Sequence, residues 1–372
     1  MPELFEKTCI HGLELKNRFV RSATWEGMAA EDGACTERLV RLMGDLAEGR
    51  VGLIISSHAY VAREGQATPW QLGIYKDGLI PSLRRMTGAV HARDGRIVAQ
   101  LAHSGCFARR QLTGTAPLAM SLVDEKGRQE YREANLEDLD NISACFAAAA
   151  GRAQDAGFDG VQIHAAHGYL LSQSLSAAFN QRNDAYGGAL ENRARLLLEV
   201  LAAVRGRVGK DYPVLVKINS ADHVENGLTL DEAVTVARML QAAGIDAIEV
   251  SGGTLISGAL SPIRLQITDE DKEAYFRHAA RDFKAVLDVP IILVGGIRSY
   301  PLAEKLLAQG AADYFSMARP FIREPHLVKR WLAGDTRPAT CVSDNACNKA
   351  AWAGQGIYCV VEKTVLAKEG TA

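Results

Sequence analysis

The sequence predicts an α/β protein, a (β/α)8 barrel of the TIM type. Eight short apolar segments recur along the 372 residues, and stretches rich in Ala, Leu, Glu and Arg with helical periodicity separate them. Near-continuous apolar strands that alternate with helices indicate a parallel sheet covered on its outer face. Eight such units favour a closed barrel. A doubly wound open sheet is the alternative architecture.

The predicted elements follow one another in a regular order. The expected strands are 17–24, 51–61, 96–105, 160–168, 212–223, 246–253, 289–299 and 312–320. Thr229 and Glu232 form a capping-box pattern that opens one of the intervening helices, and Gly244 stands where that helix should end. Residues 6–16 are expected to form a small hairpin across the barrel bottom. The long connections 107–135 and 254–271 follow strands, so they are expected at the C-terminal face, where barrel enzymes place their sites.

The composition is that of a soluble protein with one large core. The hydrophobic fraction is 48%, the charged fraction is 23%, and the net charge is −2, which argues against nucleic acid or an anionic membrane as the main partner. The start of the chain has no secretory pattern, no apolar run reaches the ~20 residues of a membrane span, and the seven cysteines are odd in number. We therefore expect a cytoplasmic protein, with a barrel over 1–335 and a C-terminal extension over 336–372.

Polar residues stand at nearly every predicted strand end. Leaving such groups buried and unpaired would cost ~1–3 kcal/mol each, so they are expected to converge on a polar small-molecule ligand. They are Thr24, His58, Gln100, His103, His164, His167, Lys217, Ser251 and Arg319.

The ends of the last two strands suggest a phosphate site. Gly295 and Gly296 end the seventh strand, and Ala318 and Arg319 end the eighth. Barrels often bind phosphate at these two loops through backbone N–H groups and an arginine. The alternative is that the glycines serve a tight turn alone. Because no G-x-G-x-x-G follows any strand, the ligand is expected to be a mononucleotide-type cofactor or a phosphorylated substrate.

With these features in view, residues 3–335 resemble the old yellow enzyme family of FMN-dependent NAD(P)H:flavin oxidoreductases and ene-reductases. The most specific block is HAAHGYLLSQSLSAAFNQRNDAYGG at 164–188. The other matching segments are KNRFVRSAT, GLIISSHAYV, VAQLAHSG, VLVKIN, EVSGG, VGGI and SMARPFIREP.

The resemblance implies a place for each part of FMN. The backbone around Ala23 and Thr24 and the side chain of Gln100 would hold the edge of the flavin ring. Lys217 would lie near N1 and the C2 carbonyl, where the family more often has an arginine; lysine keeps the charge but loses the two-pronged geometry. The implied phosphate ligands are Gly295, Gly296, Ala318 and Arg319. His58 replaces a residue whose backbone faces the flavin in many relatives, so its side chain is expected to be structural.

The resemblance also implies the reaction. His164 and His167 would donate hydrogen bonds to a substrate carbonyl, so that the β-carbon of an activated alkene accepts hydride, and Tyr169 would protonate the α-carbon. NAD(P)H would reduce the flavin and leave before the oxidant binds, in a ping-pong cycle. Amine dehydrogenase or demethylase chemistry and dienoyl reduction are the alternatives within the family. A homodimer or homotetramer is expected.

Two alternatives from other classes start from the same residues. A zinc site built on His164 and His167 would need further ligands, such as His103 or His58. The neighbouring Gln100 and Lys217 are unsuitable surroundings for a bound metal ion. A Schiff-base lyase would use Lys217, which lies between apolar residues in VLVKIN.

The sequence departs from the family pattern at two places. Trp25 stands where relatives carry Thr or Cys that tunes the flavin; an indole is larger and is expected to narrow the pocket or turn away. The C-terminal Cys341, Asp344, Cys347 and Cys359 resemble an iron–sulfur motif in which aspartate replaces the second of four cysteines. We predict a degenerate cluster site, with no metal bound, and no second nucleotide-binding domain after it.

Overall fold

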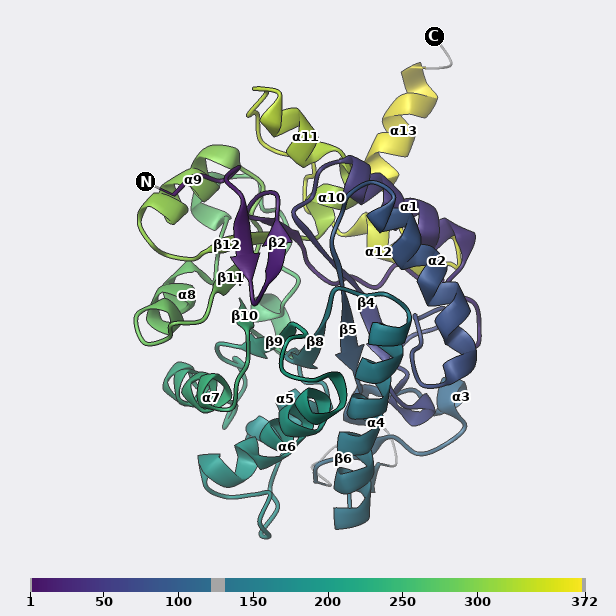
Figure 1. Cartoon of the computed structure of the whole chain (residues 1–372), viewed down its shortest axis with the longest axis vertical. Helices are drawn as coiled ribbons and strands as arrows, with labels where there is room; N and C mark the ends of the chain where they lie inside the picture. Colours follow the sequence, from purple (N-terminus) through teal and green to yellow (C-terminus); the bar gives the residue numbers. More distant parts are fainter. Residues whose placement is uncertain (1, 122–130, 370–372) are drawn as a thin grey trace.

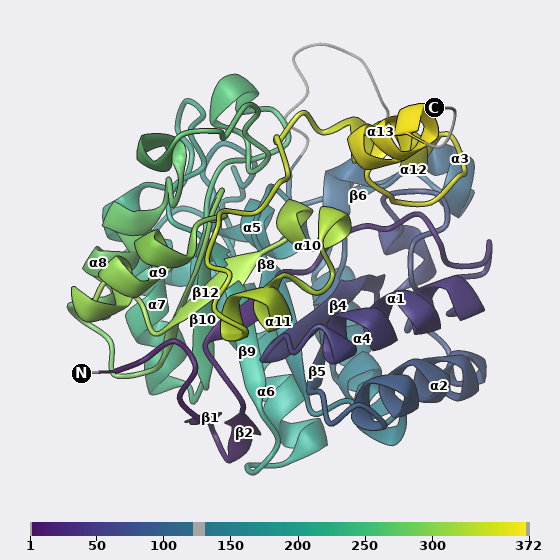
Figure 2. The ribbon, with the colours of Figure 1, turned by 90° about the horizontal axis from the view of Figure 1, so that it is seen from above.

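The computed structural model describes residues 2–121 and 131–369 and contains the predicted barrel (Figures 1 and 2). Its eight parallel strands close in the order β10-β11-β12-β3-β4-β5-β8-β9, so consecutive strands of the chain are neighbours and β12 meets β3. Each strand of the barrel lies inside a predicted one. The strands are β3 (Phe19–Arg21), β4 (Leu53–Tyr60), β5 (Ile97–Ala102), β8 (Gly160–Ala165), β9 (Val214–Asn219), β10 (Ala247–Ser251), β11 (Ile291–Val294) and β12 (Tyr314–Met317).

Helices cover the outer face of the barrel between successive strands (Figure 1). The predicted capping box opens α7: the Thr229 side chain accepts from the Glu232 N–H, and the Glu232 carboxylate accepts from the Thr229 N–H. Gly244 follows the last helical turn with φ +86°, one residue beyond the Ala243 C-cap. The covering helices are α1 (Glu37–Glu48), α2 (Ile80–His91), α4 (Leu136–Asp155), α6 (Leu190–Val208), α7 (Leu230–Ala242), α8 (Arg277–Lys284), α9 (Tyr300–Ala308), α10 (Arg319–Arg323) and α11 (Leu327–Leu332).

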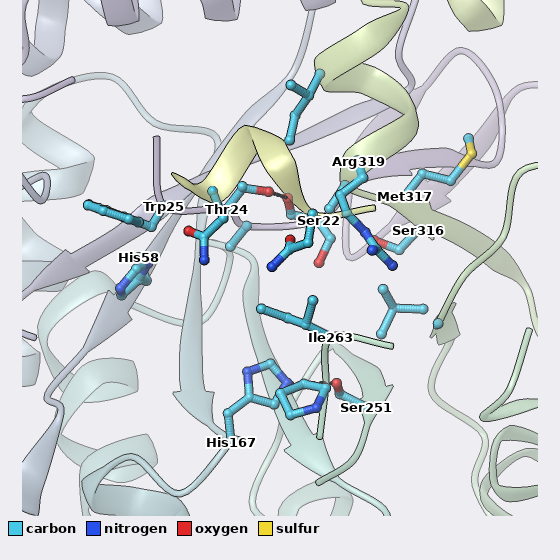
Figure 3. Close-up of a pocket in the computed structure, with 18 of the residues that line it drawn as sticks. Ser22, Thr24, Trp25, His58, His167, Ser251, Ile263, Ser316, Met317 and Arg319 are labelled. Carbon is cyan, nitrogen blue, oxygen red and sulfur yellow. Dashed lines mark hydrogen bonds between the residues drawn. The ribbon is translucent and has the colours of Figure 1, made fainter. Parts of the chain in front are cut away.

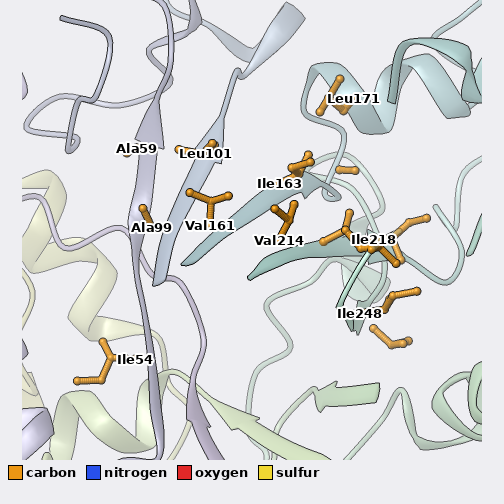
Figure 4. Packing of buried hydrophobic residues seen from close by; sticks show 14 of the residues in the cluster. Ile54, Ala59, Ala99, Leu101, Val161, Ile163, Leu171, Val214, Ile218 and Ile248 are labelled. Atoms are coloured by element: carbon orange, nitrogen blue, oxygen red, sulfur yellow. The ribbon is translucent and has the colours of Figure 1, made fainter. Parts of the chain in front are cut away.

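The alternation of side chains along each strand separates two apolar layers. Outward residues such as Ile54, Leu101 and Ile163 pack against the helices (Figure 4). Inward residues at the lower ends of the strands, such as Leu53 and Leu215, form a second cluster inside the barrel. Because successive residues of a strand face opposite sides, the inward positions further along each strand are free to carry polar groups.

The predicted hairpin closes the bottom of the barrel. Strands β1 (Thr8–Ile10) and β2 (Leu13–Leu15) are antiparallel, and Ile10 and Leu15 are fully buried in the inner apolar cluster. The opposite end of the barrel is therefore the one open to a ligand.

Short elements surround the open end. After β5 the chain forms α3 (Arg110–Thr113) and the strands β6 (Leu118–Ala119) and β7 (Arg132–Glu133), while 122–130 of the predicted long connection lie outside the described residues. After β8 comes α5 (Leu170–Leu175). The C-terminal extension contains α12 (Ala346–Trp352) and α13 (Val360–Glu369).

The C-terminal extension packs on the barrel beside the segment that follows β3. Cys347 and Ala351 of α12 form an apolar cluster with Trp25 and Met28. The two helices of the extension, α12 and α13, pack against each other. In the described part of the chain, no helix is both long and apolar enough to cross a lipid bilayer.

Candidate active site

A cavity of about 490 Å3 opens at the carboxyl ends of the strands. Both long connections reach it, through Phe107 on one side and Leu255 and Ile263 on the other. Figure 3 shows Trp25 and His58 on one side of this pocket, Arg319 and Met317 on the opposite side, and His167 with Ser251 below. The structure brings together the sequence-predicted residues Ala23, Thr24, Trp25, His58, Gln100, His164, His167, Tyr169, Lys217, Gly295, Gly296, Ala318 and Arg319, all of which line this cavity.

The two histidines of the strand-four block lie side by side, with ring centroids 5.2 Å apart. His164 is in β8, and His167 follows it in a turn with φ +64°, held by a hydrogen bond from its N–H to Asn219 Oδ1. The His167 Nε2 lies 2.8 Å from Ser251 Oγ, whereas His164 Nδ1 is buried and has no partner in the described part of the chain. His164 therefore has unused hydrogen-bonding capacity inside the site.

Both imidazoles are kept neutral by their surroundings. Burial lowers the pKa of His164 and of His167 well below the ordinary value, and the nearby Lys217 and His58 lower it further. A neutral imidazole has one N–H to donate and one nitrogen to accept. The pair can therefore donate hydrogen bonds to an oxygen without carrying charge.

Tyr169 completes this group at the N-terminus of α5. Its ring centroid is 5.0 Å from that of His164, and its hydroxyl lies 3.3 Å from His58 Nε2. Burial raises the pKa of Tyr169 above its ordinary value, so the phenol stays protonated. Burial and the Arg21 and Lys217 charges lower the pKa of His58 to about 4, which leaves its imidazole neutral. The His58 side chain thus contacts the tyrosine hydroxyl, a role that the sequence analysis missed although His58 stood at a strand end.

A buried polar network forms the floor of the cavity. Lys217 Nζ lies 3.2 Å from Glu249 Oε1 and 2.9 Å from Ser22 Oγ. Glu249 also accepts from Ser22, Ser316 and Gln162, and Gln162 accepts from Gln100 Nε2 at 2.7 Å. Strand register produces this arrangement, because Lys217 is paired with Glu249, and Gln100 with Gln162. Lys217 Nζ is thus engaged by Glu249 and Ser22, which does not favour the Schiff-base alternative.

Glu249 is the functional candidate that sequence reasoning did not single out. Its side chain is fully buried, and it accepts four hydrogen bonds. The available signal was a carboxylate in the middle of the apolar strand DAIEVS. A buried charge of this kind requires a partner, which the neighbouring strand supplies.

The opposite end of the cavity carries the predicted phosphate residues. Gly295 and Gly296 have φ of +125° and +74°, and a Cβ on either would lie 2.9 Å from the ring of Phe276 or Tyr275. Glycine is therefore required by the turn itself. Arg319 donates to the carbonyls of Arg264 and Ser343 and lines the cavity between them.

Trp25 narrows the cavity, and its N–H points elsewhere. The indole N–H donates to the Pro69 carbonyl at 3.1 Å, and the ring packs on Trp352 of α12 with centroids 4.6 Å apart. The ring lines the cavity, while its only polar group is bound to the backbone.

Of the remaining candidates, Cys341 and Cys347 reach the cavity, whereas His103, Asp344 and Cys359 do not line it. His103 is buried outside the cavity, with Nδ1 accepting from the Gly105 N–H. The side chains of Cys341, Asp344, Cys347 and Cys359 line one small pocket. Across residues 2–121 and 131–369, no three or more His, Cys, Asp or Glu side chains are grouped so that they could hold a metal ion.

The buried histidines predict that stability falls on acidification. Burial lowers the pKa of His103 from 6.5 to about 4, so the unfolded chain binds this proton first as the pH falls. The stability contributed by the neutral, buried imidazole is fully present above pH 6.5 and is lost as the pH falls toward 4. Each such histidine lowers the free energy of unfolding by up to about 1.4 kcal/mol per pH unit in this range. His103→Gln should flatten the pH dependence of the unfolding free energy, measured by urea denaturation from pH 7.5 to 4.5. Parallel profiles for wild type and variant would contradict this expectation.

Comparison with known proteins identifies the family. The model of the family described as NADH:flavin oxidoreductase / NADH oxidase matches residues 3–336. NADH oxidase of Thermoanaerobacter brockii is 34% identical over 351 residues, covering 92% of this chain and 53% of the relative, so the chain spans about half the length of that protein. The 4,4'-dithiodibutanoate disulfide reductase of Rhodococcus erythropolis is 30% identical over 396 residues, covering 99% of this chain and 97% of the relative.

A solved structure agrees with this assignment. The old yellow enzyme homologue from Zymomonas mobilis superposes with a TM-score of 0.78 at 26% identity, covering 94% of this chain and 96% of that one. The family match and the structural likeness each cover most of the chain. The chain therefore belongs to the NADH:flavin oxidoreductase / NADH oxidase family, with a barrel of old yellow enzyme type.

Proposed function

We propose that this protein is an FMN-dependent ene-reductase that takes electrons from NAD(P)H and reduces the activated C=C bond of an α,β-unsaturated carbonyl compound. The observation that carries the proposal is the grouping of two neutral imidazoles and a protonated phenol in one cavity: His164, His167 and Tyr169. Hydrogen-bond donors and a proton donor on one side of a bound alkene are what this reduction needs from a protein.

The residues around the cavity suit FMN. Gln100, Lys217 and the backbone at Ala23 and Thr24 offer polar contacts for a flavin ring, and Arg319 with the Gly295–Gly296 backbone suits a phosphate at the other end. His164 Nδ1 is buried and has no hydrogen-bond partner among the described residues, which supports a bound polar ligand in this site. FMN, when bound, supplies the two-electron chemistry by which hydride passes between nicotinamide and substrate.

The protein's own groups would then act in a defined order. His164 and His167 hold the substrate carbonyl oxygen and stabilise the negative charge that develops on it as the β-carbon accepts hydride. Tyr169 gives its proton to the α-carbon, and His58, whose Nε2 faces the phenol oxygen, orients that hydroxyl. The hydride and the proton together saturate the C=C bond.

Anaerobic stopped-flow spectroscopy tests the proposal. The purified protein should be yellow, bleach on addition of NADH or NADPH under nitrogen, and recover its colour with an enone such as 2-cyclohexenone. Absence of bound FMN, or bleached protein that no enone reoxidises, would overturn the proposed function.

Tyr169→Phe separates the two half-reactions. The variant should be reduced by NAD(P)H at a rate close to that of wild type, because that step needs no proton from the phenol. Enone saturation should slow by about 10²–10⁴-fold, the usual contribution of a positioned general acid. Equal slowing of both half-reactions would argue against Tyr169 as the proton donor.

A second candidate is reduction of a disulfide. The relative that matches 99% of this chain is named for 4,4'-dithiodibutanoate disulfide reduction. Two electrons from the flavin, together with two protons, would split such a disulfide into two thiols, so the compound belongs in the same stopped-flow series. Bleaching of the oxidised protein by an amine, without NAD(P)H, would instead favour amine oxidation.

A further inference from the structure

The charges around the active-site cavity are all of one sign. Among the described residues, no aspartate or glutamate lines the cavity, whereas Arg109, Lys217, Arg298 and Arg319 do. Three of these cations have protein partners: Lys217 is paired with Glu249, Arg298 donates to the Ala339 carbonyl, and Arg319 donates to the Ser343 and Arg264 carbonyls. Arg109 is the exception.

The Arg109 side chain makes no hydrogen bond or ion pair with any described residue, but its position is fixed by aromatic rings. Its guanidinium lies over the ring of Trp352, with Cζ 4.5 Å from the centroid. Trp352 in turn packs on Trp25, whose N–H is bound to the Pro69 carbonyl. A guanidinium stacked on an indole keeps its charge and its N–H donors. Trp352 of the C-terminal extension thus holds Arg109, which belongs to the connection after β5, at the rim of the cavity.

Arg109 lies on the side of the cavity that holds the proposed proton donor. Phe107, two residues earlier, packs against the small buried cluster that contains Tyr169. The Arg109 charge acts on the Tyr169 hydroxyl, lowering a pKa that burial raises. Arg319 is at the proposed phosphate end, across the pocket from Trp25 (Figure 3). Arg109 is therefore a cation on the substrate side of the cavity to which the proposed cofactor contacts assign no role.

We propose that Arg109, held by Trp352, is a specificity residue that binds an oxyanion, a carboxylate or phosphate, on the molecule that reacts above Tyr169. This rests on the proposed function, which has both reactants entering the same cavity in turn. Two sources offer the same chemistry: a carboxylate on the unsaturated substrate, or the 2′-phosphate of NADPH. An arginine contact of this kind at a partly solvated rim should favour the anionic ligand by about tenfold.

The test uses matched neutral and anionic ligands on the FMN-loaded protein. Cinnamaldehyde and 4-carboxycinnamaldehyde differ by one carboxylate, and NADH and NADPH differ by one phosphate. For each pair, kcat/KM is measured in wild type, Arg109→Gln, Arg109→Lys and Trp352→Leu. Arg110→Gln is the control, because it removes the neighbouring charge, which does not line the cavity.

The expected result is a change in a ratio. In Arg109→Gln, the ratio of kcat/KM for the anionic ligand to kcat/KM for the neutral ligand should fall about tenfold for one pair. The change should lie in KM and not in kcat. Arg109→Lys should retain part of the wild-type ratio. Loss for the aldehyde pair identifies the substrate carboxylate, and loss for the nicotinamide pair identifies the 2′-phosphate. Trp352→Leu should give an intermediate loss, and Arg110→Gln should leave both ratios unchanged. Unchanged ratios for both pairs in Arg109→Gln would overturn the proposal.

Equilibrium binding keeps this test separate from the proposed reaction. Isothermal titration of the oxidised protein with each aldehyde measures the same preference without turnover. If neither aldehyde reoxidises the reduced protein, the proposed function fails, while a tenfold binding preference lost in Arg109→Gln would still support the anion site. If both aldehydes react, and the anionic-to-neutral ratios of the aldehyde pair and of the nicotinamide pair are the same in wild type and Arg109→Gln, only the Arg109 proposal fails.

Discussion

Replacing both His164 and His167 by alanine is expected to slow alkene reduction by about 10³-fold. Loss of one preorganised donor to a developing oxyanion typically costs 10²–10³-fold, and residues that act as a unit are not additive. The two rings are adjacent, neutral and aimed into one cavity, so they should act on one oxygen. The measurement is the rate at which an enone reoxidises the reduced protein in anaerobic stopped flow.

The control is His164→Asn with His167→Asn, which keeps an N–H donor at each position. That variant should retain much of the rate that the alanine variant loses. Flavin content, read from absorbance, should be preserved in both. Unchanged enone turnover in the alanine variant would show that the pair does not hold the carbonyl.

Replacing Glu249 by methionine is expected to destabilise the protein by about 3–5 kcal/mol. The change leaves the Lys217 ammonium buried without its counter-ion, which is the costly way to break a buried pair. Ser22, Ser316 and Gln162 also lose their acceptor. Spread over the unfolding entropy of 372 residues, this corresponds to a Tm lower by about 4–6 °C. Urea unfolding followed by circular dichroism measures the loss.

The matched control removes both charges. Lys217→Met combined with Glu249→Met should be more stable than Glu249→Met alone, because no unpaired charge is left inside the barrel. If the double variant is less stable than the single one by the full cost of Lys217→Met, the two side chains do not depend on each other and the proposed pairing is wrong.

The sequence was sufficient for the elements and for the membership of the site. Each strand carries its own pattern of apolar residues and flanking turns, so all eight could be placed without tertiary information. The capping box at Thr229 involves residues only three positions apart, so it could also be predicted from the sequence. Because parallel strands present their carboxyl ends at one face, the nine polar residues at those ends could be expected to meet, and all of them except His103 line one cavity.

The partners of those residues were beyond the reach of local patterns. Lys217 and Glu249 are 32 positions apart in the sequence, and His58 and Tyr169 are 111 positions apart. Arg109 stacks on Trp352, which lies near the C-terminus. Such contacts depend on strand register and on where the C-terminal extension packs. Neither produces a periodic pattern of residues in the sequence. The sequence therefore contained no sign that the His58 side chain meets Tyr169, and Glu249 and Arg109 were not singled out.

The sequence by itself therefore determined the barrel, its open end, the resemblance to flavin-dependent reductases and the set of polar residues at that end. Hydrophobic periodicity and strand-end chemistry are local properties, and local properties survive in a linear sequence. Only the tertiary structure decided which charges are neutralised and which remain free. Charge pairing depends on distances of a few ångströms between side chains, and those distances exist only once the barrel has closed and the C-terminal extension has packed against it.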